Sequence, residues 1–209
     1  MRLGNVLIIG DSYSTFDGYI PKGYVFWYST DDRGRTDVVR AEDTWWHILT
    51  GSVDCTLVHN ESYSGTTVSN TERPTMPGTS FVYRTERLID GGFFRDNKID
   101  TIFLFGGTND SWIDSPVGEP RYEGRLRAHL DAVLPAFCHI VESLREAAPE
   151  ARLIAIANCD IKDEIRAGYL EAAKHYRIEL VMLEGISKQN GHPDMKGMRQ
   201  IAEQVRAAL

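Results

Sequence analysis

Five short apolar segments, separated by helix-like stretches, constrain the fold more than any other feature of the sequence. Each segment is mainly a continuous run of aliphatic, β-branched or aromatic residues rather than an alternation of apolar and polar ones. A strand has this pattern when both of its faces are covered, as in a parallel sheet between helices. The segments span residues 6–9, 53–59, 101–105, 153–157 and 178–183. We therefore predict an α/β sandwich around a parallel sheet.

Helical periodicity is clearest over residues 126–144 and again over 198–205, where apolar residues recur at the spacing of one helix face. Pro135 interrupts the longer stretch, which predicts a kink or the meeting of two helices there. Two long segments, 14–40 and 70–79, lack such periodicity. Loops this long in a domain are usually functional or disordered. The aromatic content of the first favours ordered loops that wall a site.

Composition places the chain among ordinary globular proteins. Apolar residues make up 42% and charged residues 25%, and 23 Lys and Arg against 30 Asp and Glu give a formal charge of −7. The 209 residues contain no repeat or linker, which predicts a single domain over residues 1–209. The acidic balance, without a basic run, disfavours nucleic acid and anionic membranes as partners. No apolar stretch approaches the roughly 20 residues of a membrane span.

The three cysteines, Cys55, Cys138 and Cys159, are too few and too widely spaced for a disulfide framework or a zinc site. The first apolar segment is four residues long, shorter than the core of a signal peptide. Together these features predict a cytoplasmic protein, with a processed export form as the alternative. They favour no particular oligomeric state.

Polar turns that contain glycine follow the first three predicted strands, at residues 10–12, 60–65 and 106–110. Ligands of open parallel sheets bind at the carboxyl ends of the strands, where the strand order reverses. In a flavodoxin-like sheet ordered 2-1-3-4-5, the reversal lies between strands one and three. Ser12 and Asn109 then face each other across one crevice.

Ser12, Gly65 and Asn109 are the residue types that acyl transfer needs. Ser12 lies at a strand-to-helix turn, where its hydroxyl can project and its own N–H can bind an anion. Gly65 offers a second backbone N–H with no side chain to block approach, and Asn109 adds a side-chain amide. They are candidates for a nucleophile and the donors of an oxyanion hole.

The base of such a site must be a histidine, and six are available. Five of them fall in helix-like stretches or at the end of a strand: His47, His59, His129, His139 and His175. His192 differs, because Gly191-His192-Pro193 is an irregular segment just after the last strand. This segment lies on the side of the sheet where Ser12 and Asn109 emerge, so we predict His192 as the base.

In order and spacing, these segments resemble the GDSL-type or SGNH hydrolase superfamily of serine esterases and lipases. Gly10-Asp11-Ser12 resembles the nucleophile block of that superfamily, with Tyr13 in place of the usual leucine. Gly65 matches the glycine of the second block, and Gly107-Thr108-Asn109-Asp110 matches the third. Gly191-His192-Pro193 resembles the histidine block, so the likeness covers nearly the whole chain.

The resemblance implies a three-layer α/β/α fold with a five-stranded parallel core. It also implies that Ser12 attacks a carboxylic ester, while the Ser12 N–H, the Gly65 N–H and the Asn109 amide bind the oxyanion.

The sequence departs from the superfamily pattern at Gln189, because an aspartate usually stands three residues before the histidine. A glutamine accepts a hydrogen bond but cannot stabilise an imidazolium by charge. We favour a Ser12–His192 dyad whose tautomer is fixed by Gln189 or by a backbone carbonyl. In the alternatives, Glu184 or Asp194 supplies the carboxylate, or the enzyme is slow or inactive.

Three aspartates also have structural interpretations. Asp11 and Asp110 lie in turns, where such side chains accept hydrogen bonds from nearby backbone N–H groups. Asp194 is placed to cap a final helix that starts near Met195. No set of residues with the spacing of metal ligands is visible at the crevice, so we expect neither a metal nor another cofactor.

Aromatic residues close to the blocks are candidates for the walls of a substrate pocket. Tyr13, Tyr63 and Trp112 are the main ones, with Trp27 and Tyr28 in the first long loop. No broad apolar segment suggests a long-chain lipase, so we expect a small-molecule substrate, a short-chain or acetyl ester such as an acetylated carbohydrate. The alternative is a catalytically weakened carbohydrate-binding module on the same fold. Nucleotide binding is disfavoured because no phosphate-loop pattern is present.

Overall fold

The computed structural model describes residues 2–31 and 34–209. Its centre is a five-stranded parallel sheet in the order β2-β1-β3-β4-β5, as predicted. The strands are β1 (Arg2–Gly10), β2 (Asp54–Ser62), β3 (Thr101–Phe105), β4 (Arg152–Ala157) and β5 (Glu179–Met182). All five residues of β3 are buried, which is why that strand is continuously apolar.

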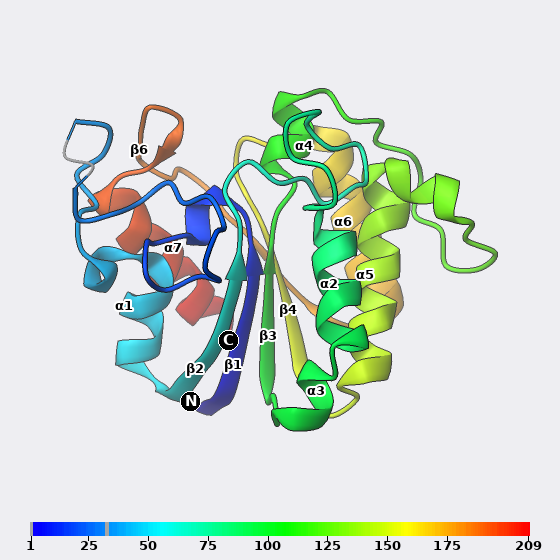
Figure 1. The fold of residues 1–209 in the computed structure, drawn as a ribbon, viewed down its shortest axis with the longest axis horizontal. Helices are drawn as coiled ribbons and strands as arrows, with labels where there is room; N and C mark the ends of the chain where they lie inside the picture. The colour runs from blue at the N-terminus through cyan, green and yellow to red at the C-terminus, as the bar shows by residue number, and fades with distance from the viewer. Residues whose placement is uncertain (1, 32–33) are drawn as a thin grey trace.

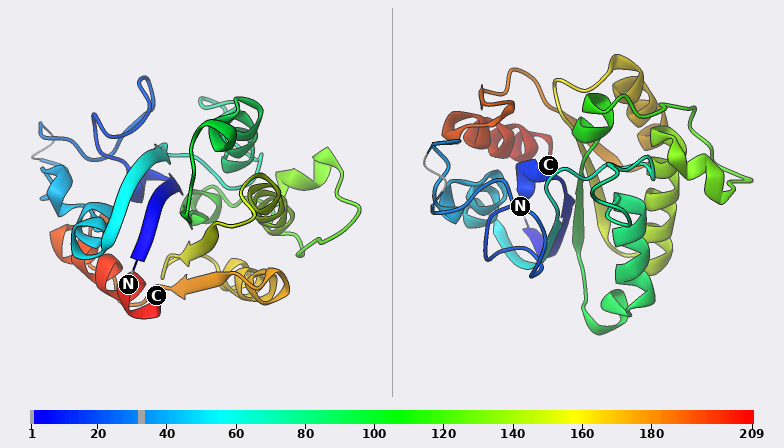
Figure 2. Two further views of the ribbon diagram at one scale, coloured as in Figure 1. Left: turned by 90° about the horizontal axis from the view of Figure 1, so that it is seen from below. Right: turned by 45° about the horizontal axis from the view of Figure 1, so that its top comes forward.

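Helices cover both faces of the sheet, and Figures 1 and 2 show the resulting three layers. One face carries α1 (Trp45–Ser52) and α7 (Met195–Ala208), and the other carries α2 (Phe81–Asp90), α5 (Val133–Ala147) and α6 (Asp163–Tyr176). Each face of the sheet contributes to its own cluster of buried apolar side chains. The predicted three-layer α/β/α architecture is confirmed.

Two sequence-based boundaries need correction. The long helical stretch is divided at Ala132, between η3 (Arg127–Asp131) and α5, rather than at Pro135. Pro135 lies in the first turn of α5, where a missing N–H removes no helical hydrogen bond. The strand β2 continues to Ser62 through buried polar residues that a hydropathy pattern does not mark.

Short elements follow the carboxyl ends of the strands, at the top of Figure 1. They are η1 (Ser12–Ser14), α4 (Thr108–Trp112) and a hairpin of β6 (Lys188–Gln189) and β7 (His192–Pro193). Elsewhere η2 (Ala41–Asp43) precedes α1, and α3 (Phe93–Asp96) follows α2. Residues 15–40 and 70–79 form long irregular segments, as predicted; residues 32 and 33 of the first lie outside the described part.

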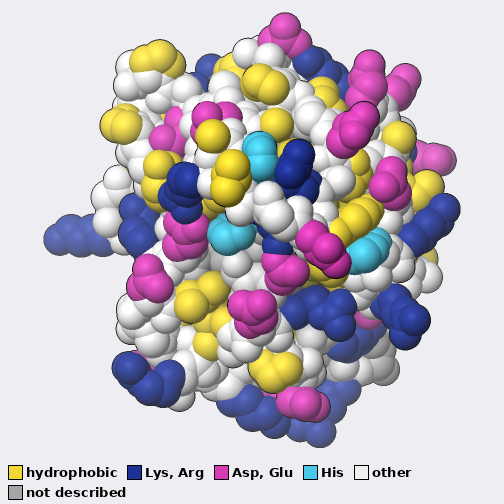
Figure 3. All heavy atoms as spheres, turned by 90° about the vertical axis from the view of Figure 1, so that its right-hand side faces the viewer, with side chains coloured by type: hydrophobic (Ala, Val, Ile, Leu, Met, Phe, Trp, Pro, Cys, Tyr) yellow, Lys and Arg dark blue, Asp and Glu magenta, His cyan; other side chains and the backbone are white. Residues whose placement is uncertain are grey.

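The described residues include no helix long and apolar enough to cross a membrane. Figure 3 shows the face on the right of Figure 1, where acidic, basic and hydrophobic side chains are interspersed.

Candidate active site

Ser12 lies in the turn that leaves β1. The strand ends at Gly10, where a Cβ atom would lie 2.6 Å from Ser62 Oγ, so only glycine fits. The next residue, Asp11, accepts a hydrogen bond from the Tyr13 N–H at 3.0 Å and caps η1. Burial raises the pKa of the Asp11 carboxyl to about 7. Asp11 thus braces the turn as predicted and holds Ser12 at the first position of η1.

His192 is presented by a tight hairpin. Asn190 and Gly191 join β6 to β7 with φ angles of 51° and 77°, as a two-residue turn of the primed type requires. The His192 Nδ1 atom is 3.1 Å from the Asn190 carbonyl oxygen, and Nε2 is 3.0 Å from Ser12 Oγ. Because a carbonyl only accepts, Nδ1 carries the proton and the Nε2 lone pair faces the Ser12 hydroxyl.

Aromatic rings enclose the His192 imidazole. Trp27 stacks on it with ring centroids 3.4 Å apart and an interplanar angle of 8°. The rings of Trp112 and Tyr13 approach it edge-on, at 5.5 Å and 5.4 Å. Burial is the main cause that lowers the pKa of His192 to about 4; the positive charges of Arg35 and Lys188 act in the same direction, and the hydrogen bond to the Asn190 carbonyl acts against them. The imidazole is therefore neutral at pH 7 and free to accept a proton.

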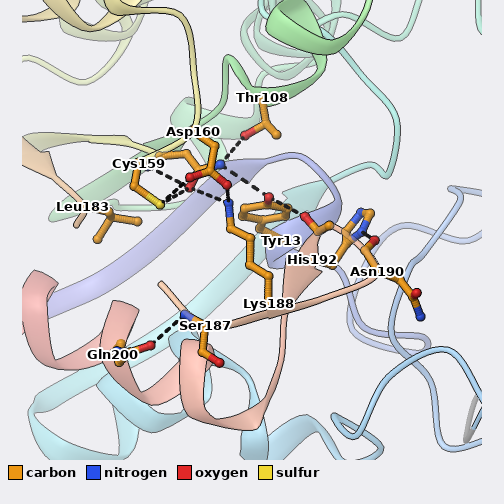
Figure 4. A network of polar contacts seen from close by, with 12 residues as sticks. Tyr13, Thr108, Cys159, Asp160, Leu183, Ser187, Lys188, Asn190, His192 and Gln200 are labelled. Atoms are coloured by element: carbon orange, nitrogen blue, oxygen red, sulfur yellow. Dashed lines mark hydrogen bonds and ion pairs between the residues drawn. The ribbon is translucent and has the colours of Figure 1, made fainter. Parts of the chain in front are cut away.

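A polar network ties the hairpin to the sheet, and Figure 4 shows it to the left of His192. The Lys188 ammonium donates to Asn158 Oδ1 at 3.3 Å and forms an ion pair with Asp160. It also lies 5.3 Å from the ring centroid of Tyr13, whose hydroxyl donates to the Gly191 carbonyl at 2.8 Å. The hairpin is thus bonded to the turn after β4 and to η1, which fixes His192 relative to Ser12.

Gly65 and Asn109 follow β2 and β3, the two strands that pair with β1 in the sheet. Gly65 follows β2 with a φ of 85°, a conformation that favours glycine. Asn109 lies in α4, directly after β3, and is only 1% exposed. Within the described part of the chain, its Nδ2 is a buried donor without a hydrogen-bond partner. Such a donor carries an energetic cost unless something else binds it.

Asp110 joins these two turns. Its buried carboxylate accepts hydrogen bonds from the Val68 N–H at 2.7 Å, and from the N–H and hydroxyl of Ser69 at 3.1 and 2.7 Å. The segment after Gly65 is therefore attached to the helix that carries Asn109. The role of Asp110 is structural, as predicted.

The structure corrects the predicted partners of His192. Gln189 and Glu184 are both exposed, and neither side chain contacts Nδ1, which bonds the Asn190 carbonyl instead. Asp194 is the N-cap of α7 and accepts from the Gly197 N–H at 2.7 Å. Of the alternatives, the geometry matches a dyad oriented by a backbone carbonyl.

The predicted pocket residues separate into three environments. Tyr13 is fully buried under His192 and belongs to the core, so its assignment to a pocket wall was wrong. Tyr63 stacks on Tyr24, with the ring centroids 4.4 Å apart. Trp112 is 47% exposed and lies beside His192, with the two ring centroids 5.5 Å apart.

Sequence reasoning missed Asn190 and Arg73 and named Trp27 only as one aromatic among several. The Asn-Gly dipeptide is a strong signal for a hairpin and points to the Asn190 turn. Arg73 donates to the Gly65 carbonyl at 3.2 Å and to Asn109 Oδ1 at 3.4 Å. No local pattern marks that arginine. The described residues contain no cluster of three His, Cys, Asp or Glu side chains able to hold a metal ion.

Comparison with known proteins adds relatives of the whole chain. The family model described as GDSL-like lipase/acylhydrolase matches residues 4–209. A structure from Bacteroides uniformis, described as a GDSL-like lipase, is 37% identical with a TM-score of 0.90, covering 99% of this chain and 95% of its own. One of the same description from Bacteroides ovatus is 33% identical with a TM-score of 0.87, covering 99% and 98%.

A carbohydrate acetylesterase from Sinorhizobium meliloti shares the fold at 15% identity, with a TM-score of 0.56 and coverage of 99% of this chain and 100% of its own. The comparison with curated proteins found no match. The family match extends over nearly the whole sequence, and both Bacteroides structures are more than 30% identical to it. The chain therefore belongs to the GDSL-like lipase/acylhydrolase family and is a carboxylic-ester hydrolase.

Proposed function

We propose that Ser12 is the nucleophile of this hydrolase and that His192 is its base, without a carboxylate partner. The observation that carries the proposal is the 3.0 Å contact between Ser12 Oγ and His192 Nε2, with Nδ1 bonded to the Asn190 carbonyl. This arrangement sets the tautomer that a general base needs. Asn109 supports the same site, because its Nδ2 is a buried donor without a partner among the described residues and can donate to an oxyanion.

In this mechanism Ser12 Oγ attacks the ester carbonyl carbon while its proton passes to His192 Nε2. The oxyanion of the tetrahedral intermediate accepts hydrogen bonds from the backbone N–H groups of Ser12 and Gly65 and from the Asn109 amide. Collapse of the intermediate expels the alcohol, which takes the proton from His192. Water then attacks the acyl-enzyme by the same route and releases the acid.

We propose a short acyl or acetyl ester of a carbohydrate as the substrate. Ser12 and Asn109 are each only 1% exposed, which favours a compact acyl group over an extended chain. The exposed face of Trp112 beside His192 suits the stacking of a sugar ring. The fold is also that of the carbohydrate acetylesterase from Sinorhizobium meliloti.

The alternative, a carbohydrate-binding module with weakened catalysis, depends on the missing aspartate alone. The Asn190 carbonyl can fix the tautomer of His192, so the absence of that aspartate does not by itself imply lost turnover. No other observation favours the alternative. An activated serine distinguishes the two functions, because a binding module does not need one.

The test is hydrolysis of p-nitrophenyl acetate by the wild type and by Ser12→Ala. We expect the variant to lose about 10⁴-fold or more in kcat, as loss of a nucleophile does in serine hydrolases. A fluorophosphonate probe should label the wild type but not Ser12→Ala. Ser52→Ala is the matched control, because Ser52 lies on α1 and its hydroxyl donates to the Leu49 carbonyl at 2.8 Å. Unchanged turnover in Ser12→Ala would exclude the assignment.

The acyl preference is tested with the same protein. We expect kcat/KM to fall from the acetate to the decanoate ester of p-nitrophenol, and an acetylated monosaccharide to release acetate. A preference for decanoate would reject the short-chain substrate while leaving the nucleophile in place.

A further inference from the structure

Arg73 contacts two of the three residues proposed to bind the oxyanion. Its Nε donates to the Gly65 carbonyl at 3.2 Å, and its Nη2 donates to Asn109 Oδ1 at 3.4 Å. Gly65 follows β2 whereas Asn109 follows β3, so the Arg73 side chain connects the segments that follow two different strands. The established ester hydrolysis assigns no role to this arginine.

The segment that carries Arg73 is firmly attached. The neighbouring Glu72 carboxylate accepts from the N–H groups of Gly78, Thr79 and Ser80 at 2.7, 2.6 and 2.5 Å. The segment also packs directly on the site, since a Cβ atom at Gly65 would lie 3.0 Å from the sulfur of Met76. Arg73 is therefore held against Gly65 by its own loop.

The guanidinium determines which way the Asn109 amide faces. Arginine has only donors, so the atom of Asn109 that meets it must be Oδ1. Nδ2 is then turned to the opposite side, where it is the buried donor without a partner among the described residues. A charged donor on Oδ1 also polarises the amide and makes Nδ2–H the stronger donor.

The charge of Arg73 is not neutralised locally. Across residues 2–31 and 34–209, no carboxylate forms an ion pair with it. A cation hydrogen-bonded to the Gly65 carbonyl and to Asn109 Oδ1 favours the tetrahedral intermediate over the neutral ester, because negative charge develops only in the intermediate.

We propose that Arg73 is a positioning residue of the oxyanion hole, which orients the Asn109 amide, braces Gly65 and places a positive charge beside the intermediate. This inference rests on the proposed function, because it assumes that Gly65 and Asn109 bind the oxyanion. Its effect is on kcat rather than on KM, since it acts through groups that bind the transition state.

The experiment compares Arg73→Met, Arg73→Lys and the control Arg87→Met in hydrolysis of p-nitrophenyl acetate. Arg87 contacts the same loop through the Gly78 carbonyl but lies outside the site. We expect Arg73→Met to lower kcat about 10- to 100-fold with KM within about threefold, somewhat less than removal of a direct donor. Arg73→Lys keeps the positive charge but lacks the planar guanidinium with its several N–H donors, so we expect it to retain more kcat than Arg73→Met. Arg87→Met keeps wild-type kcat.

A double-mutant cycle with Asn109→Ala separates positioning from a general loss of structure. We expect Arg73→Met to cost much less in the Asn109→Ala background, because the amide that it orients is gone. Phenylboronic acid, which forms a tetrahedral adduct with an active serine, should bind Arg73→Met more weakly by about the same factor as the fall in kcat. Thermal unfolding confirms that each variant is folded.

Three results would overturn the inference: wild-type kcat in Arg73→Met, the same loss with and without Asn109, or an equal loss in Arg87→Met. Failure of the proposed function looks different, because Ser12→Ala would then keep its turnover and the fluorophosphonate probe would not label Ser12.

Discussion

The two sides of the proposed active site are held in place by different parts of the fold. Ser12, Gly65 and Asn109 emerge directly after β1, β2 and β3, which are hydrogen-bonded neighbours in the central sheet. His192 instead comes from a hairpin whose strands are two residues each and which pairs only with itself. The sheet side has the residues expected at Ser12, Gly65 and Asn109 and departs from the family pattern at Tyr13, whereas the hairpin side lacks the usual aspartate. The departure that concerns the orientation of His192 therefore lies on the hairpin side.

Side-chain contacts must stabilise the hairpin, because a two-stranded ribbon alone is marginal in water. The Tyr13 hydroxyl donates to the Gly191 carbonyl and the Tyr28 hydroxyl donates to the Pro193 carbonyl, each at 2.8 Å. Trp27 covers the imidazole itself. The sheet side is held by backbone hydrogen bonds between strands, and the histidine side is held by contacts of aromatic side chains. Substitutions on the two sides should therefore lower kcat by different amounts.

The largest effect in this comparison is expected on the sheet side, from Asn109→Ala. The substitution removes a preorganised oxyanion donor, which costs about 10²- to 10³-fold in kcat in serine hydrolases. KM should change little, because the donor acts on charge that develops after binding. Asn97→Ala is the control, because its amide only caps α3 through the Phe93 carbonyl. Steady-state kinetics in which both variants behave alike would contradict the assigned role.

The same division explains how much of the molecule could be predicted from sequence. Doubly covered strands are continuously apolar, and the turns after them carry glycines and polar residues, so the sheet, Ser12 and Asn109 are visible as local patterns. The orienting group of His192 is a main-chain carbonyl, which every residue has, so its identity leaves no mark in the sequence. Only the Asn-Gly dipeptide at residues 190–191 indicates the turn that aims it.

The contacts of Arg73 could not be predicted from the sequence, for a different reason. Arg73 contacts Gly65 and Asn109, which are not its neighbours in the sequence. The loop that brings it there is held by the Glu72 carboxylate, which accepts hydrogen bonds from three backbone N–H groups. The break before α5 was misplaced because Pro135 disrupts a helix interior but is tolerated in a first turn. In both places tertiary context decides what a local pattern leaves open.

A smaller effect is expected on the histidine side, from Trp27→Ala. An aromatic stack is worth about 0.5–1.5 kcal/mol, so loss of the ring should lower kcat about two- to tenfold. It should also hydrate the imidazole and raise the pKa of His192 toward its ordinary value. Trp27→Phe should retain most of the activity. Tyr19→Ala is the control, since Tyr19 lies in the same loop but packs on Phe16 and Trp46. An unchanged pH profile in Trp27→Ala would show that the stack does not shield the base.

The smallest expected effect, a shift of the pH profile, tests the missing carboxylate itself. The base is active when neutral, and burial lowers the pKa of His192 to about 4, so wild-type kcat/KM should be flat near neutral pH and fall only below about pH 4. Gln189→Asp places a carboxylate at the usual family position. A nearby anion favours the imidazolium, so the acid limb should move to higher pH, toward the ordinary histidine value of roughly 6.5.

The matched control for that shift is Gln189→Asn, which shortens the side chain without adding charge. If Gln189→Asp moves the limb and Gln189→Asn does not, a carboxylate on the hairpin reaches His192 electrostatically. An acid limb already near pH 6.5 in the wild type would contradict the burial of the base. Unlike a change in the oxyanion hole, this substitution alters the strength of a base whose tautomer is already set by the Asn190 carbonyl. A shift of this kind would change the pKa of His192 while leaving the proposed oxyanion donors on the sheet side unchanged.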